Sequence, residues 1–224
     1  MSGQWTDAVA VDGHKLRIYL ARPEGKAKGA VVVLQEIFGV NAHIRSVCDR
    51  LAADGYVAAA PALFDRLSQG YEAGYAPDDV KKGMELLQGF DFDKAVDDIT
   101  AAIEALRPHG MVSIIGFCLG GSLAYKMATR PSGIASAACY YGGLIADYAD
   151  KAPLCPVVLH YGANDPTIPP ENVETVRHAQ PDLPIYVYPA GHGFNCDARQ
   201  AYEPKSADLA WERTMEMIDR ASKA

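Results

Sequence analysis

The sequence predicts an α/β protein built on a mostly parallel sheet with helices on both faces. Short apolar runs rich in β-branched residues alternate along the chain with longer segments whose apolar residues recur every three or four positions. The first pattern is typical of buried strands and the second of amphipathic helices. Strands separated by helices need crossover connections, so this alternation favours parallel pairing. With 224 residues and 49% hydrophobic residues, the chain fits one domain over residues 1–224.

Seven apolar runs predict strands, and glycine or proline bounds most of them. The run KLRIYLARP alternates apolar and polar residues before it ends at Pro23. The run GAVVVLQE is almost continuously β-branched, which is typical of a strand buried on both faces. We expect strands at residues 15–23, 29–36, 56–63, 111–116, 134–142, 156–162 and 184–189.

The segments between these runs predict helices, and several have recognisable ends. Asn41 is a candidate N-cap for the first helix, which Gly55 would stop. Residues 65–77 should be irregular, because two glycines and a proline interrupt them. We expect helices at residues 41–54, 78–88, 93–106 and 119–129, after Pro170, and in a last segment ending near Ala221.

Composition excludes several classes of function. The formal net charge is −7 and no basic run exceeds two residues, which disfavours nucleic-acid binding. The five cysteines are widely spaced, with no CxxC pair and no zinc-ligand spacing, so we expect free thiols and no metal. No apolar run reaches the roughly 18 residues that suggest a membrane span. These features, and an N-terminus without a signal-like apolar segment, predict a cytoplasmic protein that acts on a small molecule.

The stretch IIGFCLGG at residues 114–121 carries the strongest chemical signal. It follows a predicted strand, precedes a predicted helix and has the Gly-x-Cys-x-Gly spacing of a nucleophile elbow. Gly116 and Gly120 would keep the strained turn free of clashes, and Gly121 would let the helix pack closely. The helix N-terminus would place positive potential at the sulfur of Cys118. The alternative for Cys118 is a buried structural cysteine.

Two further polar residues follow late strands, at the edge where parallel sheets bind ligands. Asp165 in GANDPTIPP is a candidate acid, although it could instead be a turn aspartate, and Asn164 is its rival. His192 in AGHGFN is a candidate base, with an exposed loop histidine as the alternative. The order Cys118, Asp165, His192 matches the nucleophile–acid–base order of α/β-hydrolases.

Glu36 closes the second predicted strand. A carboxylate after a fully apolar strand is costly unless it is paired or lies in a cleft, although a capping or solvated glutamate is the alternative. The loop after this strand usually supplies one oxyanion-hole amide in α/β-hydrolases. We therefore expect the backbone N–H groups of Ile37 and Leu119 to form the oxyanion hole.

With these residues in place, the chain resembles the dienelactone hydrolase family, the carboxymethylenebutenolidases, of the α/β-hydrolase superfamily. The resemblance covers nearly the whole chain, in LQEIFGVN, GFCLGG, CYYGG, GANDPTIP, AGHGFN and the tail AYEPKSADLAWERTMEMI. It implies an α/β-hydrolase fold and a Cys118–His192–Asp165 triad. It also implies that Glu36 interacts with the resting thiol and helps to generate the thiolate. Members are expected to be cofactor-free cytoplasmic hydrolases, monomers or weak homodimers, that act on enol-lactones from aromatic compound degradation.

The substrate pocket departs from what the resemblance implies. Familiar members hold a substrate carboxylate with two arginines, where this chain has Val80, Lys81 and Lys82 and, after the histidine, Asn195 and Cys196. Arg199 is a possible substitute. By analogy, segment 62–90 would roof the pocket. Core packing is the alternative for two of the candidate lining residues, Phe38 and Tyr141; the others are Tyr75, Met84 and Leu87.

A cysteine nucleophile predicts acyl transfer through a thioester on Cys118. A thiolate leaves easily, so an intermediate formed from a plain alkyl ester would collapse back to the reactants. Enol-lactones, aryl esters and thioesters have leaving groups good enough to compete. One alternative is a promiscuous carboxylesterase or thioesterase with an unrelated substrate. Another is a non-enzymatic binding or redox-sensing protein that uses Cys118 as an oxidisable thiol.

Overall fold

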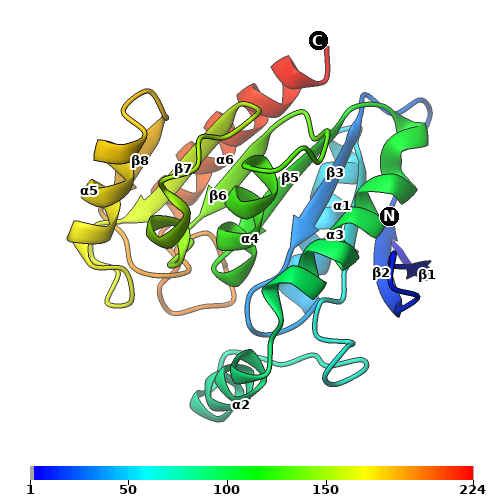
Figure 1. Cartoon of the computed structure of the whole chain (residues 1–224), viewed down its shortest axis with the longest axis horizontal. Coiled ribbons are helices and arrows are strands. Elements are labelled where there is room, and N and C mark those ends of the chain that lie inside the picture. Colours follow the sequence, from blue (N-terminus) through cyan, green and yellow to red (C-terminus); the bar gives the residue numbers. More distant parts are fainter. Residues whose placement is uncertain (1–2, 224) are drawn as a thin grey trace. The chain divides into compact units, whose positions relative to one another are not determined.

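The computed structural model describes residues 3–223, which fall into two compact units that meet in sequence at Val112 and Ser113 (Figure 1). The described residues contain eight strands and six α-helices. Within the units, two strand pairings are antiparallel and four are parallel. The expectation of an α/β protein with mostly parallel strands is thus confirmed. The expectation of one domain stays a prediction.

The first unit has the strand order β1-β2-β4-β3. Its β3 and β4 are parallel, whereas β2 pairs antiparallel with both β1 and β4. The sequence analysis missed β1, because its residues QWTDAV are largely exposed and carry no apolar run. The strands are β1 (Gln4–Val9), β2 (Lys15–Ala21), β3 (Ala30–Leu34) and β4 (Val57–Pro61), and the helices are α1 (Ala42–Ala53), α2 (Pro77–Gln88), α3 (Phe92–Leu106) and the 3₁₀ turn η1 (Arg107–His109).

The start and the end of α1 follow from the local sequence. The side chain of Asn41 accepts a hydrogen bond from the backbone N–H of Ile44, which satisfies one of the free N–H groups of the first turn. Gly55, just past the helix, has a φ of 96°, a conformation that glycine adopts at little cost. Both expected ends of this helix are therefore confirmed.

The second unit has the strand order β5-β6-β7-β8, and all of its pairings are parallel. Every residue of β5, β6 and β7 is buried, as expected for strands covered on both faces. The strands are β5 (Val112–Phe117), β6 (Ala137–Tyr140), β7 (Val157–Gly162) and β8 (Ile185–Tyr188), and the helices are α4 (Leu119–Ala128), α5 (Pro170–Ala179), α6 (Pro204–Ala221) and the 3₁₀ turn η2 (Ile145–Tyr148).

Strand β6 is shorter than the run that predicted it. The chain leaves the strand at Tyr141, whose φ is 39°, a conformation that a bulky side chain rarely adopts. Gly142 follows, and a Cβ built there would lie 2.7–2.8 Å from Ile145, Gly121 and Ser122. The apolar run therefore continues past the strand as a buried turn.

A polar network crosses the core of the second unit. His160 on β7 is fully buried, with Nδ1 2.9 Å from the Tyr188 hydroxyl and Nε2 3.1 Å from Thr214 Oγ1. Thr214 Oγ1 lies 2.8 Å from the Tyr140 hydroxyl, and Arg213 donates to the Tyr188 hydroxyl at 3.1 Å. Burial and, to a smaller extent, the charge of Arg213 lower the pKa of His160 to about 3, so the ring is neutral.

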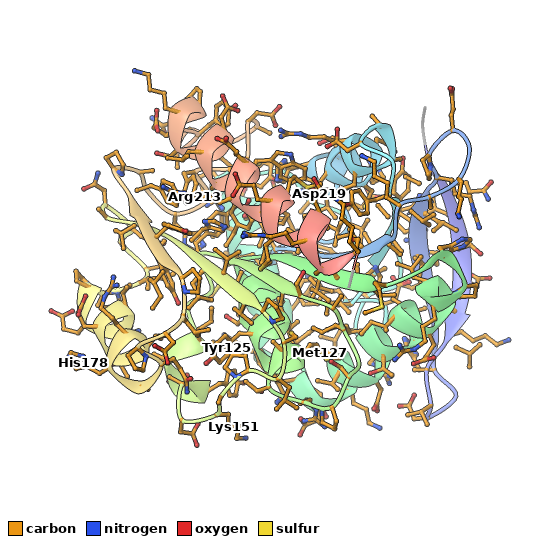
Figure 2. All side chains as sticks on the ribbon, turned by 90° about the horizontal axis from the view of Figure 1, so that it is seen from above. Tyr125, Met127, Lys151, His178, Arg213 and Asp219 are labelled. Carbon is orange, nitrogen blue, oxygen red and sulfur yellow. The ribbon has the colours of Figure 1, made fainter. Side chains whose placement is uncertain are left out.

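Side chains on α4 and α6 close the core of the second unit (Figure 2). Tyr125 and Met127 on α4 are at most 1% exposed, and the Tyr125 hydroxyl donates to the carbonyl of Lys151 at 3.2 Å. On α6, Arg213 stacks over the Tyr186 ring, with its guanidinium carbon 3.8 Å from the ring centroid.

Among the described residues, no helix combines the length and the hydropathy needed to cross a bilayer.

Candidate active site

Cys118 sits on a strained turn between β5 and α4. Its φ of 53° and ψ of −112° are unusual for a residue with a side chain. The turn is held on both sides: the Cys118 N–H donates to the carbonyl of Tyr140 at 3.0 Å, and the Cys118 carbonyl accepts from the Ser122 N–H at 3.1 Å. Such strain persists only where the surrounding structure over-determines it, and here it projects the thiol from a half-buried position at the N-terminus of α4.

The glycines of the elbow have the tight surroundings that the motif predicts. A Cβ on Gly116 would lie 2.0 Å from the carbonyl oxygen of Gly120. A Cβ on Gly121 would lie 2.4 Å from the carbonyl oxygen of Tyr140. Both neighbours are backbone atoms and cannot move independently, so only glycine allows α4 to start this close to β5 and β6.

Asp165 and His192 form an ion pair in the second unit. Asp165 follows β7 and His192 follows β8, and Asp165 Oδ2 lies 2.7 Å from His192 Nδ1. Only 1% of the Asp165 side chain and 12% of the His192 side chain are exposed. The two strand ends therefore bring the predicted acid and the predicted base into contact, as expected for neighbouring parallel strands.

The environment of the pair stabilises its charged form. Burial opposes charge on His192, but hydrogen bonds to Asp165 and Cys118, together with their negative charges, raise its pKa to about 10. Burial likewise opposes charge on Asp165, but its hydrogen bonds to His192 and Thr167 lower its pKa. Cys118 is thus a direct partner of His192, and the three predicted triad residues come together.

Thr167 also belongs to this cluster, although the sequence analysis did not select it. Its hydroxyl lies 2.7 Å from Asp165 Oδ1 and 3.0 Å from His192 Nδ1. The available signal was local: a threonine two residues after a turn aspartate often bonds back to that carboxylate.

The loop that carries His192 packs against buried aromatic rings. The Tyr141 ring centroid lies 5.0 Å from that of His192 and 5.5 Å from that of Phe194. Tyr141, a candidate lining residue, is fully buried here. Gly193 has a φ of 81°, and a Cβ on it would lie 2.4 Å from the guanidinium of Arg199, which places Arg199 beside the histidine loop.

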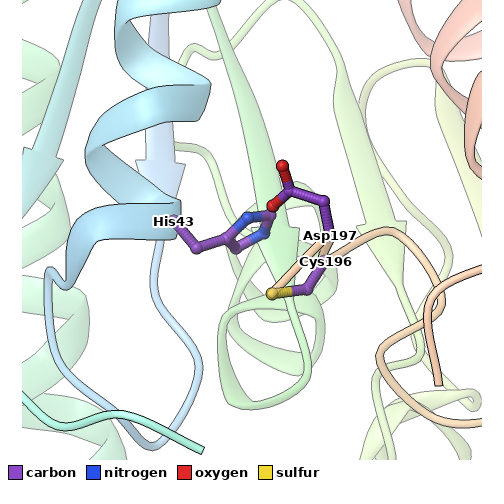
Figure 3. A group of neighbouring side chains, drawn as sticks. All are labelled: His43, Cys196 and Asp197. Atoms are coloured by element: carbon purple, nitrogen blue, oxygen red, sulfur yellow. The ribbon is translucent and has the colours of Figure 1, made fainter. Parts of the chain in front are cut away.

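The same loop continues into a second turn, in which Figure 3 labels Cys196 and Asp197. Cys196 is buried, and its N–H donates to the carbonyl of Gly193 at 3.0 Å. The exposed Asp197 follows it. The buried side chain of Cys196 therefore anchors the turn that leads away from His192.

In the first unit, Glu36 lies just beyond β3 with 1% of its surface exposed. The Tyr75 hydroxyl donates to Glu36 Oε2 at 3.2 Å and lies 3.1 Å from the side-chain nitrogen of Asn41. The Phe38 and Tyr75 rings meet edge to face, with centroids 4.7 Å apart. Glu36 is thus buried and hydrogen-bonded and not solvated, and two other predicted site residues, Tyr75 and Phe38, form one cluster with it.

The remaining candidates of the first unit lie on or beside α2. Met84 is 49% exposed and Leu87 is partly exposed. Gly83 is buried, and a Cβ on it would lie 2.6 Å from the carbonyl oxygen of Ile37, which explains the glycine within this helix. Ile37 is buried in the first unit, and Leu119 opens α4 in the second.

A strained Gly-x-Cys-x-Gly turn after β5 and an Asp–His pair after β7 and β8 are typical of an α/β-hydrolase. The dienelactone hydrolase family model matches residues 16–222, and the chain belongs to this family.

Relatives that match this chain along nearly its whole length support the same family. The Pseudomonas putida carboxymethylenebutenolidase is 31% identical over 220 residues, which cover 92% of each chain. A Synechocystis protein, provisionally assigned to the same activity, is 33% identical over 95% of this chain and 96% of its own. A crystal structure from Klebsiella pneumoniae, provisionally assigned as a dienelactone hydrolase, has a TM-score of 0.83 at 32% identity and covers 96% of this chain and 98% of its own. The protein is therefore a carboxylic ester hydrolase that acts on small molecules.

Proposed function

We propose that this protein hydrolyses enol-lactones and other activated esters through a thioester on Cys118. The observation that carries the proposal is the Asp165–His192–Cys118 chain in the second unit, where Asp165 Oδ2 lies 2.7 Å from His192 Nδ1 and Cys118 is a hydrogen-bond partner of His192. Because Nδ1 faces Asp165, the ring presents Nε2 to the sulfur.

The proposed reaction has two stages. The Cys118 thiol gives its proton to His192 Nε2, the sulfur attacks the carbonyl carbon of the ester, a sulfur–carbon bond forms, and the carbon–oxygen bond to the leaving group breaks. The proton on His192 Nε2 goes to the departing oxygen, which leaves His192 neutral. Water then attacks the thioester while His192 takes its proton, so the carboxylic acid leaves and the thiol is regenerated.

Sulfur limits the range of substrates. A free thiol has a pKa of about 8.5, so a thiolate leaves far more readily than an alkoxide. The tetrahedral intermediate expels the better leaving group, and with a simple alkyl ester that group is Cys118 itself. Enolates, phenolates and thiolates compete with it, which favours enol-lactones, aryl esters and thioesters. The roles of Glu36, of the Ile37 and Leu119 amides, and of the candidate pocket residues stay predictions from the sequence.

Intact-mass measurement tests the proposal directly. Rapid quenching with p-nitrophenyl esters should show an acyl adduct that peptide mapping places on Cys118. Cys118→Ala should abolish both the adduct and turnover. Cys155→Ala, at another half-buried free cysteine, should leave both unchanged. Hydrolysis by Cys118→Ala at the wild-type rate would overturn the proposal, and equal rates on ethyl and p-nitrophenyl esters would overturn the leaving-group argument.

A further inference from the structure

One hydroxyl bridges the acid and the base of the second unit. Thr167 Oγ1 lies 2.7 Å from Asp165 Oδ1 and 3.0 Å from His192 Nδ1. The Thr167 backbone N–H also donates to Asp165 Oδ1, at 2.8 Å. The other carboxylate oxygen, Oδ2, contacts His192 Nδ1 at 2.7 Å. Both oxygens of this buried carboxylate are therefore occupied, and Thr167 occupies Oδ1 with two donors.

Counting the available protons fixes the direction of each hydrogen bond in this cluster. An ionised carboxylate only accepts, so the single hydroxyl proton of Thr167 is donated to Asp165. His192 Nδ1 must then carry a proton, which it donates to Asp165 Oδ2. The lone pairs of Thr167 Oγ1 face the same N–H and offer it a second acceptor. This arrangement fixes the ring so that Nε2 is the nitrogen available to Cys118.

We propose that Thr167 is a positioning residue that holds Asp165 and His192 in the geometry and the protonation state that the Cys118 reaction requires. This inference rests on the function proposed above. A charged imidazolium donates stronger hydrogen bonds than a neutral ring, so a second acceptor favours the charged form. The hydroxyl therefore acts on the histidine both directly and through the carboxylate.

Other charged or titratable groups of the second unit also face the histidine. Cys118 is another hydrogen-bond partner of His192, and Tyr141 packs against the ring with centroids 5.0 Å apart. The guanidinium of Arg199 lies beside the neighbouring Gly193. A substitution at Thr167 leaves all of these groups in place. A change in the titration of His192 would thus report the missing hydroxyl.

The test compares Thr167→Val with Thr167→Ser. Both variants keep the backbone N–H that binds Asp165 Oδ1, and only the serine variant keeps the hydroxyl. The readout is kcat/KM for phenyl acetate against pH, because phenolate is a poor enough leaving group to need the proton of His192. The alkaline ionisation should move down by about one pH unit in Thr167→Val, the size expected for one hydrogen bond to a charged group. Thr167→Ser should follow the wild type.

Two controls separate the possible failures. Thr175→Val removes an exposed threonine hydroxyl that bonds only to the carbonyl of Glu171, and its pH profile should be unchanged. If Thr167→Val does not fold, Thr167→Ala carries the same test without the extra methyl group. A wild-type alkaline ionisation in a folded variant without the hydroxyl overturns the role of Thr167. Continued turnover by Cys118→Ala overturns the proposed function instead.

Discussion

Each unit contains a buried carboxylate with a cationic side chain beside it, but the two carboxylates have different roles. Asp98 on α3 is fully buried and accepts two hydrogen bonds from Arg66, at 2.7 and 2.8 Å. Asp165 is nearly as buried and pairs with His192 at 2.7 Å. The guanidinium is always protonated, whereas an imidazole can gain and lose a proton. The first pair therefore serves structure, and the second can take part in proton transfer.

The two carboxyl groups also shift in opposite directions. Burial raises the pKa of Asp98, and Arg66 only partly offsets it. Burial also opposes charge on Asp165, but His192 and both donors of Thr167 together lower its pKa. Both oxygens of Asp98 are also occupied, by Arg66 alone, so the difference lies in the two additional donors that Thr167 supplies to Asp165. The hydrogen bonds from Thr167, added to the attraction of His192, outweigh at Asp165 the burial that prevails at Asp98.

The largest expected effect follows from removing the charge of Asp165. Asp165→Asn should lower kcat/KM for p-nitrophenyl acetate by about 10³–10⁴-fold, since an amide favours the wrong tautomer of the histidine and cannot stabilise its charged form. The melting temperature should change little. Asp182→Asn, at an exposed aspartate of the same unit, is the matched control. Less than tenfold loss in Asp165→Asn would contradict the assigned acid.

The converse experiment targets the Arg66–Asp98 pair. Arg66→Met leaves Asp98 buried without its partner and should lower the free energy of unfolding by about 3 kcal/mol. Urea denaturation measures this change, while the folded variant should keep its kcat. Adding Asp98→Asn should recover part of the loss, because the uncompensated charge is gone. A loss below about 1 kcal/mol would show that the Arg66–Asp98 pair does not stabilise the fold.

The pH dependence of stability distinguishes the Asp165–His192 pair from the Asp98–Arg66 pair. His192 has its pKa raised to about 10, so its stabilising contribution is full below about pH 6.5 and disappears as the pH rises through 10. The advantage of the wild type over His192→Gln in unfolding free energy should be greater at pH 6 than at pH 10, by on the order of 1–2 kcal/mol. Urea titrations at both pH values measure it. A difference in unfolding free energy between the wild type and His192→Gln that grows with pH would contradict the raised pKa of His192.

The smallest expected effect concerns an exposed ion pair. Arg177 and Glu174 on α5 lie 3.3 Å apart at i,i+3 spacing, with about half of each side chain exposed. Glu174→Gln should change the free energy of unfolding by less than about 0.5 kcal/mol, because water and salt screen the pair. A change of more than about 1 kcal/mol in the free energy of unfolding, measured by urea denaturation, would contradict this expectation. The difference between the buried carboxylates, Asp98 and Asp165, and the exposed Glu174 could then not be explained by burial.

Much of the fold was predictable because its strongest signals are local. The β-branched runs that became β3 and β5, the cap at Asn41 and the stop at Gly55 all depend on residues close together in the chain. Strand β1 was missed because pairing with β2, and not burial, keeps it in place. The early end of β6 was missed because the strain at Tyr141 comes from contacts made after folding.

The sequence by itself determined the class of fold, the turn around Cys118 and the order of the three predicted triad residues. These features depend on hydrophobic periodicity, on glycines where no side chain fits, and on residue types at strand ends. Only the tertiary structure decided that Asp165 and His192 touch, that Tyr75 bonds to Glu36, and that Thr167 bridges the acid and the base. Hydrogen bonds between residues tens of positions apart depend on ångström-scale placement, which residue type and spacing do not encode.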